Sequence, residues 1–186
     1  MFLDNKFFVL AITGPSGVGK STVCKEIVKI HEENLERLVT YTTRCPRRNE
    51  QNGVDYHFVS REQFLTFLSA GRFLEVDEYA GNLYGIPFFD VQNKLKVLTI
   101  NYNGVKNLKR NFGAKVCSVC LVADFGTLKE RLISRASISS DNRLENAEKE
   151  LGMFLGIGRS FVDFYIRNYD LNETVKKFDN LLQLIF

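Results

Sequence analysis

The fold of this chain is decided by the stretch Gly14-Pro-Ser-Gly-Val-Gly19-Lys20-Ser21. The stretch fits the pattern GxxxxGK[ST], which forms a phosphate-binding loop when it lies between a strand and a helix. An apolar run from Phe7 to Ile12 precedes it and has the length of a buried strand. Lys20 to His31 follows it, with apolar residues spaced to share one helical face. Strand, loop and helix therefore occur in the required order.

The loop predicts a site for the phosphates of ATP. Its glycines let the backbone wrap around an anion, so that N–H groups and the helix N-terminus can bind it. Lys20 is expected to reach the β- and γ-phosphate oxygens, and the Ser21 hydroxyl is expected to ligate Mg²⁺, the cofactor carried with ATP. The residues of this stretch expected to bind ATP are Gly14, Pro15, Ser16, Gly17, Val18, Gly19, Lys20, Ser21 and Thr22.

Strands and helices alternate along most of the chain. The expected strands are Phe7–Ile12, Leu38–Thr42, Val97–Ile100, Val116–Ala123 and Phe164–Arg167. The expected helices are Lys20–His31, Val105–Arg110, Leu128–Arg135, one that carries Leu144, Ala147 and Leu151, and Leu171–Leu184. This order predicts an α/β fold of the P-loop NTPase kind, in which a parallel sheet is flanked by helices on both faces.

One part of the chain lacks this regular alternation of strands and helices. From Pro46 to about Asp90 the sequence consists of short segments with turn-forming residues around one amphipathic helix, about Glu62 to Ala70. We expect about residues 46–90 to be a lobe inserted into a core of about residues 1–45 and 91–186. A polar break at about residues 136–142 is expected to be a short lid. Residues 1–186 would then form one domain with a substantial core.

Charge, hydropathy and cysteines disfavour several other classes of protein. The formal net charge of +3 gives no reason to expect a nucleic-acid surface. No apolar run approaches membrane length, and the N-terminus does not resemble a signal peptide. Cys117 and Cys120 lie in an apolar run that predicts a buried strand rather than a metal site. We expect a cytoplasmic monomer or homodimer with no nucleic-acid or membrane partner.

A family resemblance begins after the loop, in the segment Thr40-Tyr-Thr-Thr-Arg44-Cys-Pro-Arg47-Arg-Asn-Glu-Gln-Asn-Gly53-Val-Asp55-Tyr56-His-Phe-Val. It closely resembles the segment with which the guanylate kinase family holds the monophosphate of GMP. The resemblance implies that Arg44, Arg47 and Tyr56 bind this phosphate. Two guanidinium groups and a phenol can saturate a phosphate dianion in a fixed orientation. Without these flanking residues, the arginines would be interpreted as a solvated basic turn.

Two further motifs resemble the acceptor site of that family. Gly71-Arg-Phe-Leu-Glu75 is similar to G-x-F-x-E, whose glutamate accepts the N1–H and N2–H donors of guanine. Asn82-Leu-Tyr84-Gly85 is similar to N-x-Y-G, whose tyrosine also contacts the acceptor phosphate. The GMP-binding residues that the resemblance implies are Thr40, Arg44, Arg47, Tyr56, Glu75, Tyr84 and Asn101.

The resemblance also implies which residues act on the transferring phosphoryl group. Leu128-Lys-Glu-Arg131-Leu-Ile-Ser-Arg135 is similar to the helix that delivers lid arginines, and Arg143 is similar to the lid's returning arginine. The implied catalytic residues are Lys20, Arg44, Arg131, Arg135 and Arg143. Asn168 stands where the family has an asparagine near the adenine of ATP, although a plain turn asparagine is an equally good interpretation. No strong base is expected, because the acceptor phosphate oxygen is already nucleophilic.

Three features depart from the family pattern. The strand that in the family ends in Asp-x-Asp reads Thr99-Ile-Asn101 here, on the side of the site that serves Mg²⁺ and guanine. Asn101 can still accept a hydrogen bond from guanine N2–H through its Oδ1. Ile86 replaces a small hydroxyl residue near the base, and the segment between Arg135 and Arg143 is a few residues shorter.

These features predict an ATP-dependent kinase that converts GMP or dGMP to the diphosphate. One alternative is a kinase with the same machinery for another nucleoside monophosphate or a sugar phosphate. Another is a degenerate guanylate-kinase-like module that binds proteins, which would have no need for the intact ATP half. The substitutions at Thr99 and Asn101 predict weak activity with GMP and an elevated Mg²⁺ requirement.

Overall fold

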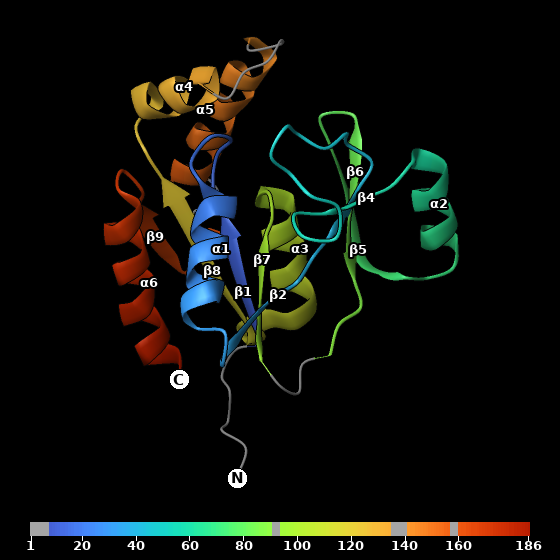
Figure 1. The fold of residues 1–186 in the computed structure, drawn as a ribbon, viewed down its shortest axis with the longest axis horizontal. Helices are drawn as coiled ribbons and strands as arrows, with labels where there is room; N and C mark the ends of the chain where they lie inside the picture. The colour runs from blue at the N-terminus through green and yellow to red at the C-terminus, as the bar shows by residue number, and fades with distance from the viewer. Residues whose placement is uncertain (1–7, 91–93, 135–140, 157–159) are drawn as a thin grey trace.

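The structure is a computed structural model and describes residues 8–90, 94–134, 141–156 and 160–186. Its larger sheet has five parallel strands in the order β2-β7-β1-β8-β9 (Figure 1). These strands are β1 (Val9–Thr13), β2 (Leu35–Arg37), β7 (Leu95–Thr99), β8 (Val116–Val122) and β9 (Phe164–Arg167). The predicted parallel sheet is confirmed, and Cys117 and Cys120 are both buried in β8.

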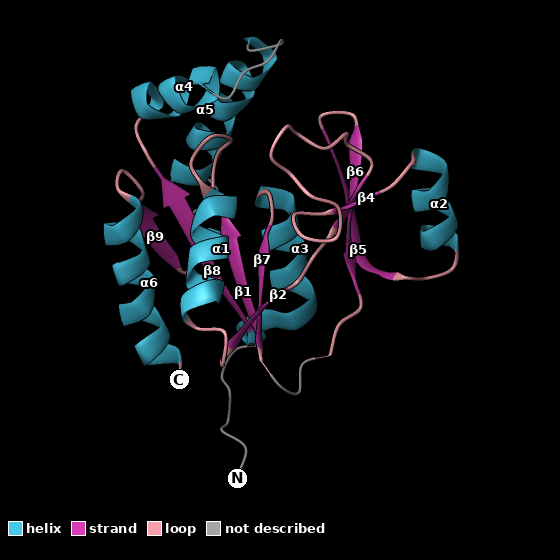
Figure 2. Cartoon of the chain, viewed as in Figure 1, coloured by secondary structure: helices cyan, strands magenta, loops and turns pink. Residues whose placement is uncertain are grey.

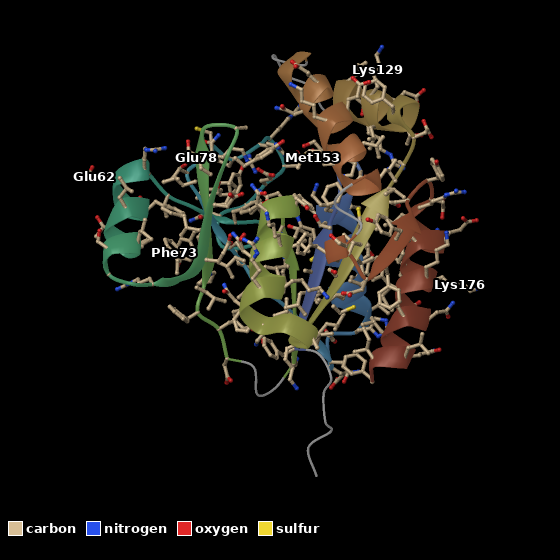
Figure 3. The ribbon with its side chains drawn as sticks, turned by 180° about the vertical axis from the view of Figure 1, so that it is seen from behind. Glu62, Phe73, Glu78, Lys129, Met153 and Lys176 are labelled. Carbon is tan, nitrogen blue, oxygen red and sulfur yellow. The ribbon has the colours of Figure 1, made fainter. Side chains whose placement is uncertain are left out.

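Helices cover both faces of this sheet. They are α1 (Lys20–Ile30) and α6 (Leu171–Ile185) on one face and α3 (Tyr102–Phe112), followed by the short 3₁₀ turn η1 (Gly113–Lys115), on the other. Phe154 of α5 (Asp141–Leu155) packs against Cys120 of β8, and α4 (Phe125–Ser134) lies beside α5 beyond the ends of the strands (Figure 1). All five residues of β1 are buried, as expected for a strand at the centre of a parallel sheet. Leu10 and Ile12 pack with α1 and α6, whereas Val9 and Ala11 pack on the opposite face with Leu108 of α3. Figures 2 and 3 show α3 on the face away from α1.

A second sheet forms most of a separate part that we call the side lobe, residues 41–87. Its strand order is β4-β3-β6-β5, and α2 packs beside it (Figure 1). The elements are β3 (Tyr41–Thr42), β4 (His57–Phe58), α2 (Arg61–Ser69), β5 (Phe73–Tyr79) and β6 (Asn82–Pro87). Ser60 and Gln63 form a capping box at the start of α2, which confirms the helix expected there.

The strand expected at Leu38–Thr42 is wrong in its boundaries. Leu35 to Arg37 pair with β7 in the large sheet, and Tyr41–Thr42 pair with β4 and β6 in the side lobe. The chain therefore crosses from one sheet to the other within the run that was interpreted as one strand. The second sheet consequently includes residues before Pro46, the start expected for the inserted lobe. The expected lid, about residues 136–142, lies almost entirely outside the described residues.

Within the described ranges, no helix has both the length and the apolar character that are needed to cross a bilayer.

Candidate active site

The phosphate-binding loop runs from the end of β1 to the start of α1. Gly14 has φ of 134°, and a Cβ there would lie 2.3 Å from the carbonyl oxygen of Leu121 in β8. Gly19 has φ of 100°, and a Cβ there would lie 2.6 Å from the Asn168 amide nitrogen. Both positions therefore require glycine, for backbone conformation and for space.

Lys20 lies across this loop at the first position of α1. Its ammonium donates to the carbonyl oxygens of Gly14 at 2.6 Å and Pro15 at 3.1 Å. Ser21 and Thr22 follow in the first turn and are exposed. A positive charge, exposed hydroxyls and a helix N-terminus thus meet at one place, which is the environment a polyphosphate needs.

Asn168 and Arg131 fix the loop from outside. The buried Asn168 amide donates to the Val18 carbonyl at 2.7 Å and accepts from the Thr174 hydroxyl at 2.9 Å. Arg131 donates to the carbonyls of Val18 at 3.3 Å, Asn168 at 2.9 Å and Tyr169 at 3.0 Å. Both side chains therefore bind protein groups next to the loop. Their roles toward adenine and the transferring phosphoryl group stay predictions.

Replacing Asn168 by alanine should lower the free energy of unfolding by about 1–3 kcal/mol, because it removes two buried hydrogen bonds, one to the Val18 carbonyl and one from the Thr174 hydroxyl. The matched control is Asn172→Ala on α6, where the asparagine is exposed and the change should cost under about 0.5 kcal/mol. Urea denaturation of both variants measures the difference. Equal stability of the two variants would contradict the clamping role of Asn168.

A carboxylate that the sequence did not indicate lies on the same loop. The Ser16 backbone N–H donates to Oε2 of Glu150 in α5 at 2.7 Å. Tyr79 of β5 lies close to Glu150 and Ser16, and burial together with the Glu150 charge raises the pKa of this tyrosine. The loop, α5 and the side lobe are thereby joined at one point.

Arg44 forms the centre of a second basic site, in the side lobe. Its Nη1 and Nη2 donate to the two carboxylate oxygens of Glu50 at 2.9 and 3.0 Å, and Nη1 also donates to the Cys45 carbonyl at 2.7 Å. Burial alone would raise the pKa of Glu50, but the hydrogen bonds from Arg44 and from the Arg47 N–H hold it below its usual value. Glu50 thus fixes one edge of the guanidinium and leaves the Nε edge for another anion.

Aromatic residues continue this site toward the core. The Arg44 guanidinium carbon lies 5.5 Å from the ring centre of Tyr56. The ring of Tyr84 lies 6.1 Å from that of Tyr56 and 6.4 Å from that of Tyr79. The Tyr56 side chain also lies close to Thr99, at the end of β7. Thr40 is buried beside β3, and its carbonyl accepts from the His57 N–H at 2.8 Å.

One face of β5 points at the core. A bulge between Phe73 and Glu75 changes the direction of the side chains. Phe73, labelled in Figure 3, stacks on Phe64 of α2 with ring centres 4.5 Å apart. Glu75 instead accepts from the Asn107 amide at 2.8 Å. Asp77, on the same face, accepts from the Asn101 amide at 2.6 Å. Burial raises the pKa of Glu75, and the nearby Asp77 carboxylate raises it further.

The residues expected to bind the two nucleotides therefore gather in two places. The loop residues lie at the ends of β1 and β8, and the acceptor residues Arg44, Tyr56, Glu75 and Tyr84 lie in the side lobe. Arg47 is largely exposed and lies 3.7 Å from Glu50. Arg135 lies outside the described residues, and so does the side chain of Arg143. The Oδ1 of Asn101 accepts from the Gly104 N–H at 2.8 Å and caps α3, and its use toward the base stays a prediction.

The donor set fits a magnesium ion that arrives with the nucleotide. Mg²⁺ usually keeps several waters and takes one or two protein oxygens together with substrate phosphates. The exposed Ser21 hydroxyl beside the Lys20 ammonium supplies one such oxygen. In the part of the chain that the structure describes, three or more His, Cys, Asp or Glu side chains nowhere form a group that could hold a metal alone.

Comparison with known proteins identifies the family. The guanylate kinase family model matches residues 6–184. A guanylate kinase of Listeria innocua is 33% identical, over 97% of this chain and 90% of that protein. A guanylate kinase of Lactobacillus delbrueckii subsp. bulgaricus is 38% identical, over 80% of this chain and 77% of that protein.

A solved structure agrees with these relatives. The crystal structure of guanylate kinase from Anaplasma phagocytophilum superposes with a TM-score of 0.77 at 28% identity, over 98% of this chain and 87% of that chain. The match extends through both sheets, and the family model spans the loop and the acceptor residues alike. The chain therefore belongs to the guanylate kinase family, whose members are nucleoside monophosphate kinases.

Proposed function

We propose that this protein transfers the γ-phosphoryl group of ATP to GMP or dGMP, which yields ADP and the guanosine or deoxyguanosine diphosphate. One observation carries the proposal: a continuous row of side chains joins two sites suited to phosphate. Tyr79 lies close to Ser16 of the loop, and Tyr84 lies between Tyr79 and Tyr56. Tyr56 in turn lies beneath Arg44. A donor phosphate and an acceptor phosphate would bind at the two ends of this row.

The proposed chemistry needs charge neutralisation and positioning rather than a base. A phosphate oxygen of GMP attacks the γ-phosphorus, a new O–P bond forms, and the bond to the β-phosphate oxygen breaks as ADP leaves. Lys20 offsets the negative charge on the β- and γ-phosphates, while Arg44 and Tyr56 hold the acceptor phosphate in line. Mg²⁺ bound with ATP, near Ser21, supplies further neutralisation of the phosphate charge.

Glu75 is the proposed reader of the guanine base. A carboxylate can accept both N1–H and N2–H, whereas an amide must present an N–H to one of them. Glu75→Gln should therefore lower kcat/KM for GMP by about ten- to hundredfold and leave KM for ATP within about twofold. Steady-state kinetics with each substrate varied in turn measures both values. Wild-type kinetics with GMP would show that Glu75 does not read the base.

The matched control for Glu75→Gln is Glu78→Gln. Glu78 lies on the same strand but is exposed, and by strand alternation it points away from the face that carries Glu75. The two substitutions remove the same charge from the same element. Only the change at Glu75 should affect the use of GMP.

An ADP-release assay with a panel of acceptors tests the proposed function. The panel contains GMP, dGMP, AMP, CMP, UMP and a sugar phosphate, with a no-acceptor control for ATP hydrolysis. Release of ADP with GMP and dGMP well above the other acceptors supports the proposal. Turnover with another acceptor only would favour the same machinery with a rebuilt base site. ADP release with none of them would favour the degenerate binding module.

Two further features belong to this proposal. The unpaired cysteines, of which Cys45 is exposed, support a reducing compartment such as the cytosol. The enzyme would act there as a monomer or homodimer on small nucleotides. Light scattering after size-exclusion chromatography distinguishes the two assemblies.

A further inference from the structure

Three asparagine side chains of α3 and its N-cap, which follow β7 in the core, donate hydrogen bonds to the side lobe. Asn101 and Asn103, at the start of α3, direct their amide nitrogens to Asp77, at 2.6 and 3.5 Å. Asn107, one turn further along α3, donates to Glu75 at 2.8 Å. The carboxylates of this contact therefore all come from β5, and the amides all come from the core.

The orientation of the Asn101 amide is fixed from both ends. Its Oδ1 accepts from the Gly104 N–H at 2.8 Å, as the N-cap of α3, and its Nδ2 donates to Asp77 Oδ2 at 2.6 Å. A flipped amide would place an N–H against the Gly104 N–H and an oxygen against a carboxylate. The side of Asn101 that faces β5 is consequently a donor.

A donor at this position is a poor match for a guanine edge, because N1 and the 2-amino group of guanine are donors too. The acceptor that is available at the same place is the Asp77 carboxylate. It lies two residues after Glu75 on the same face of β5, and the two carboxylates are close enough for Asp77 to affect the titration of Glu75. A ligand edge that carries several N–H donors would relieve this repulsion between like charges.

We propose that Asp77 is a specificity residue, which accepts a hydrogen bond from the 2-amino group of guanine in place of residue 101. Asp77 and Glu75 together would form a wall of acceptors along the donor edge of the base, with Glu75 opposite N1–H. Asn101 becomes a positioning residue, because its amide holds the Asp77 carboxylate and its oxygen holds the start of α3. The assignment rests on the proposed use of GMP as acceptor.

The assignment is tested by comparing GMP with inosine monophosphate, which lacks only the 2-amino group. Wild-type enzyme should prefer GMP by about tenfold or more in kcat/KM, the range expected for a charge-assisted hydrogen bond. Asp77→Asn should lower this preference to within about threefold, because its amide must present an N–H to the base once its oxygen accepts from Asn101. KM for ATP should stay within about twofold. Because the readout is a ratio within one protein, partial loss of stability does not alter it.

Two further variants separate recognition from a structural role. Glu78→Gln, on the exposed face of β5, should keep the wild-type preference for GMP. Asp77→Ala should lower the preference for GMP over inosine monophosphate. Asp77→Ala combined with Asn101→Asp should restore at least half of that loss, measured on a logarithmic scale. The aspartate at 101 can still cap α3 with one oxygen and present the other as an acceptor.

The outcomes distinguish this assignment from the proposed function. An unchanged preference in Asp77→Asn, or a double variant no better than Asp77→Ala, would overturn the assignment while GMP turnover by the wild type stands. Wild-type enzyme that uses neither GMP nor inosine monophosphate would instead overturn the proposed function.

Discussion

Replacing Lys20 by alanine is expected to lower kcat about 10³-fold or more. Removal of one group that stabilises the charge of a transition state typically lowers kcat by about 10²–10³-fold. Phosphoryl transfer depends almost entirely on such groups, so a loss at the upper end of this range is expected. The Lys20 ammonium already lies over the loop, on the carbonyls of Gly14 and Pro15. The measurement is the ADP-release rate at saturating ATP and GMP.

Lys29→Ala is the matched control for Lys20→Ala. Lys29 lies in the last turn of the same helix and is exposed, so its loss should change kcat by less than about twofold. If Lys20→Ala kept more than a tenth of the wild-type kcat while Lys29→Ala behaved normally, the loop would have no part in the chemical step.

Replacing Arg44 by leucine should lower kcat/KM for GMP by about 100-fold or more, because two charge-assisted hydrogen bonds to the acceptor phosphate are lost. KM for ATP should change by less than about threefold, since the loop is untouched. Arg44→Lys should recover only part of the lost kcat/KM for GMP. An ammonium group lacks the planar geometry that lets a guanidinium bind Glu50 on one edge and a phosphate on another. Steady-state kinetics of the three proteins gives these ratios.

Arg48→Leu is the control for position 44, because Arg48 is an exposed arginine of the same turn. Its loss should change kcat/KM for GMP by less than about threefold. Thermal unfolding is measured in parallel, since Arg44→Leu leaves the half-buried Glu50 without its partner. A folded Arg44→Leu protein with wild-type kcat/KM would remove Arg44 from the acceptor site.

The core of this fold could be predicted from sequence because its signals are local. The phosphate-binding loop is one continuous stretch, and β1, α1, β8 and β9 carry their patterns within a few residues of the expected bounds. Cys117 and Cys120 show the same principle, since an apolar run correctly predicted a buried strand. The resemblance then added the expected acceptor residues, most of which lie in the side lobe, while Thr40 directly precedes it and Asn101 lies in the core.

The details of the side lobe could not be predicted in this way. Strand β5 has a bulge after Phe73, so simple alternation would assign Phe73 and Glu75 to one face, whereas Phe73 packs on α2 and Glu75 faces α3. The chain also changes sheets between Arg37 and Tyr41, which no periodicity within so short a run can reveal. The turn residues Ala80 and Gly81, both with positive φ, were the available signal for the β5–β6 hairpin.

Contacts between residues that are far apart in the sequence could not be predicted either. Glu150 is an ordinary helix-surface residue by sequence, and its hydrogen bond to Ser16 joins residues 134 positions apart. The cap that the Asn101 side chain provides at the start of α3 is likewise visible only in the structure. No sequence motif marks Asp77, because its significance depends on the amides that α3 brings to it.

The most direct test of the central claim, transfer of a phosphoryl group from ATP to GMP, is a ³¹P NMR time course of wild-type enzyme with ATP, GMP and Mg²⁺. The GMP signal should disappear as the two doublets of GDP and the two doublets of ADP grow, with no inorganic phosphate formed at a comparable rate. An unchanged GMP signal, with or without release of inorganic phosphate from ATP, would contradict the proposed transfer.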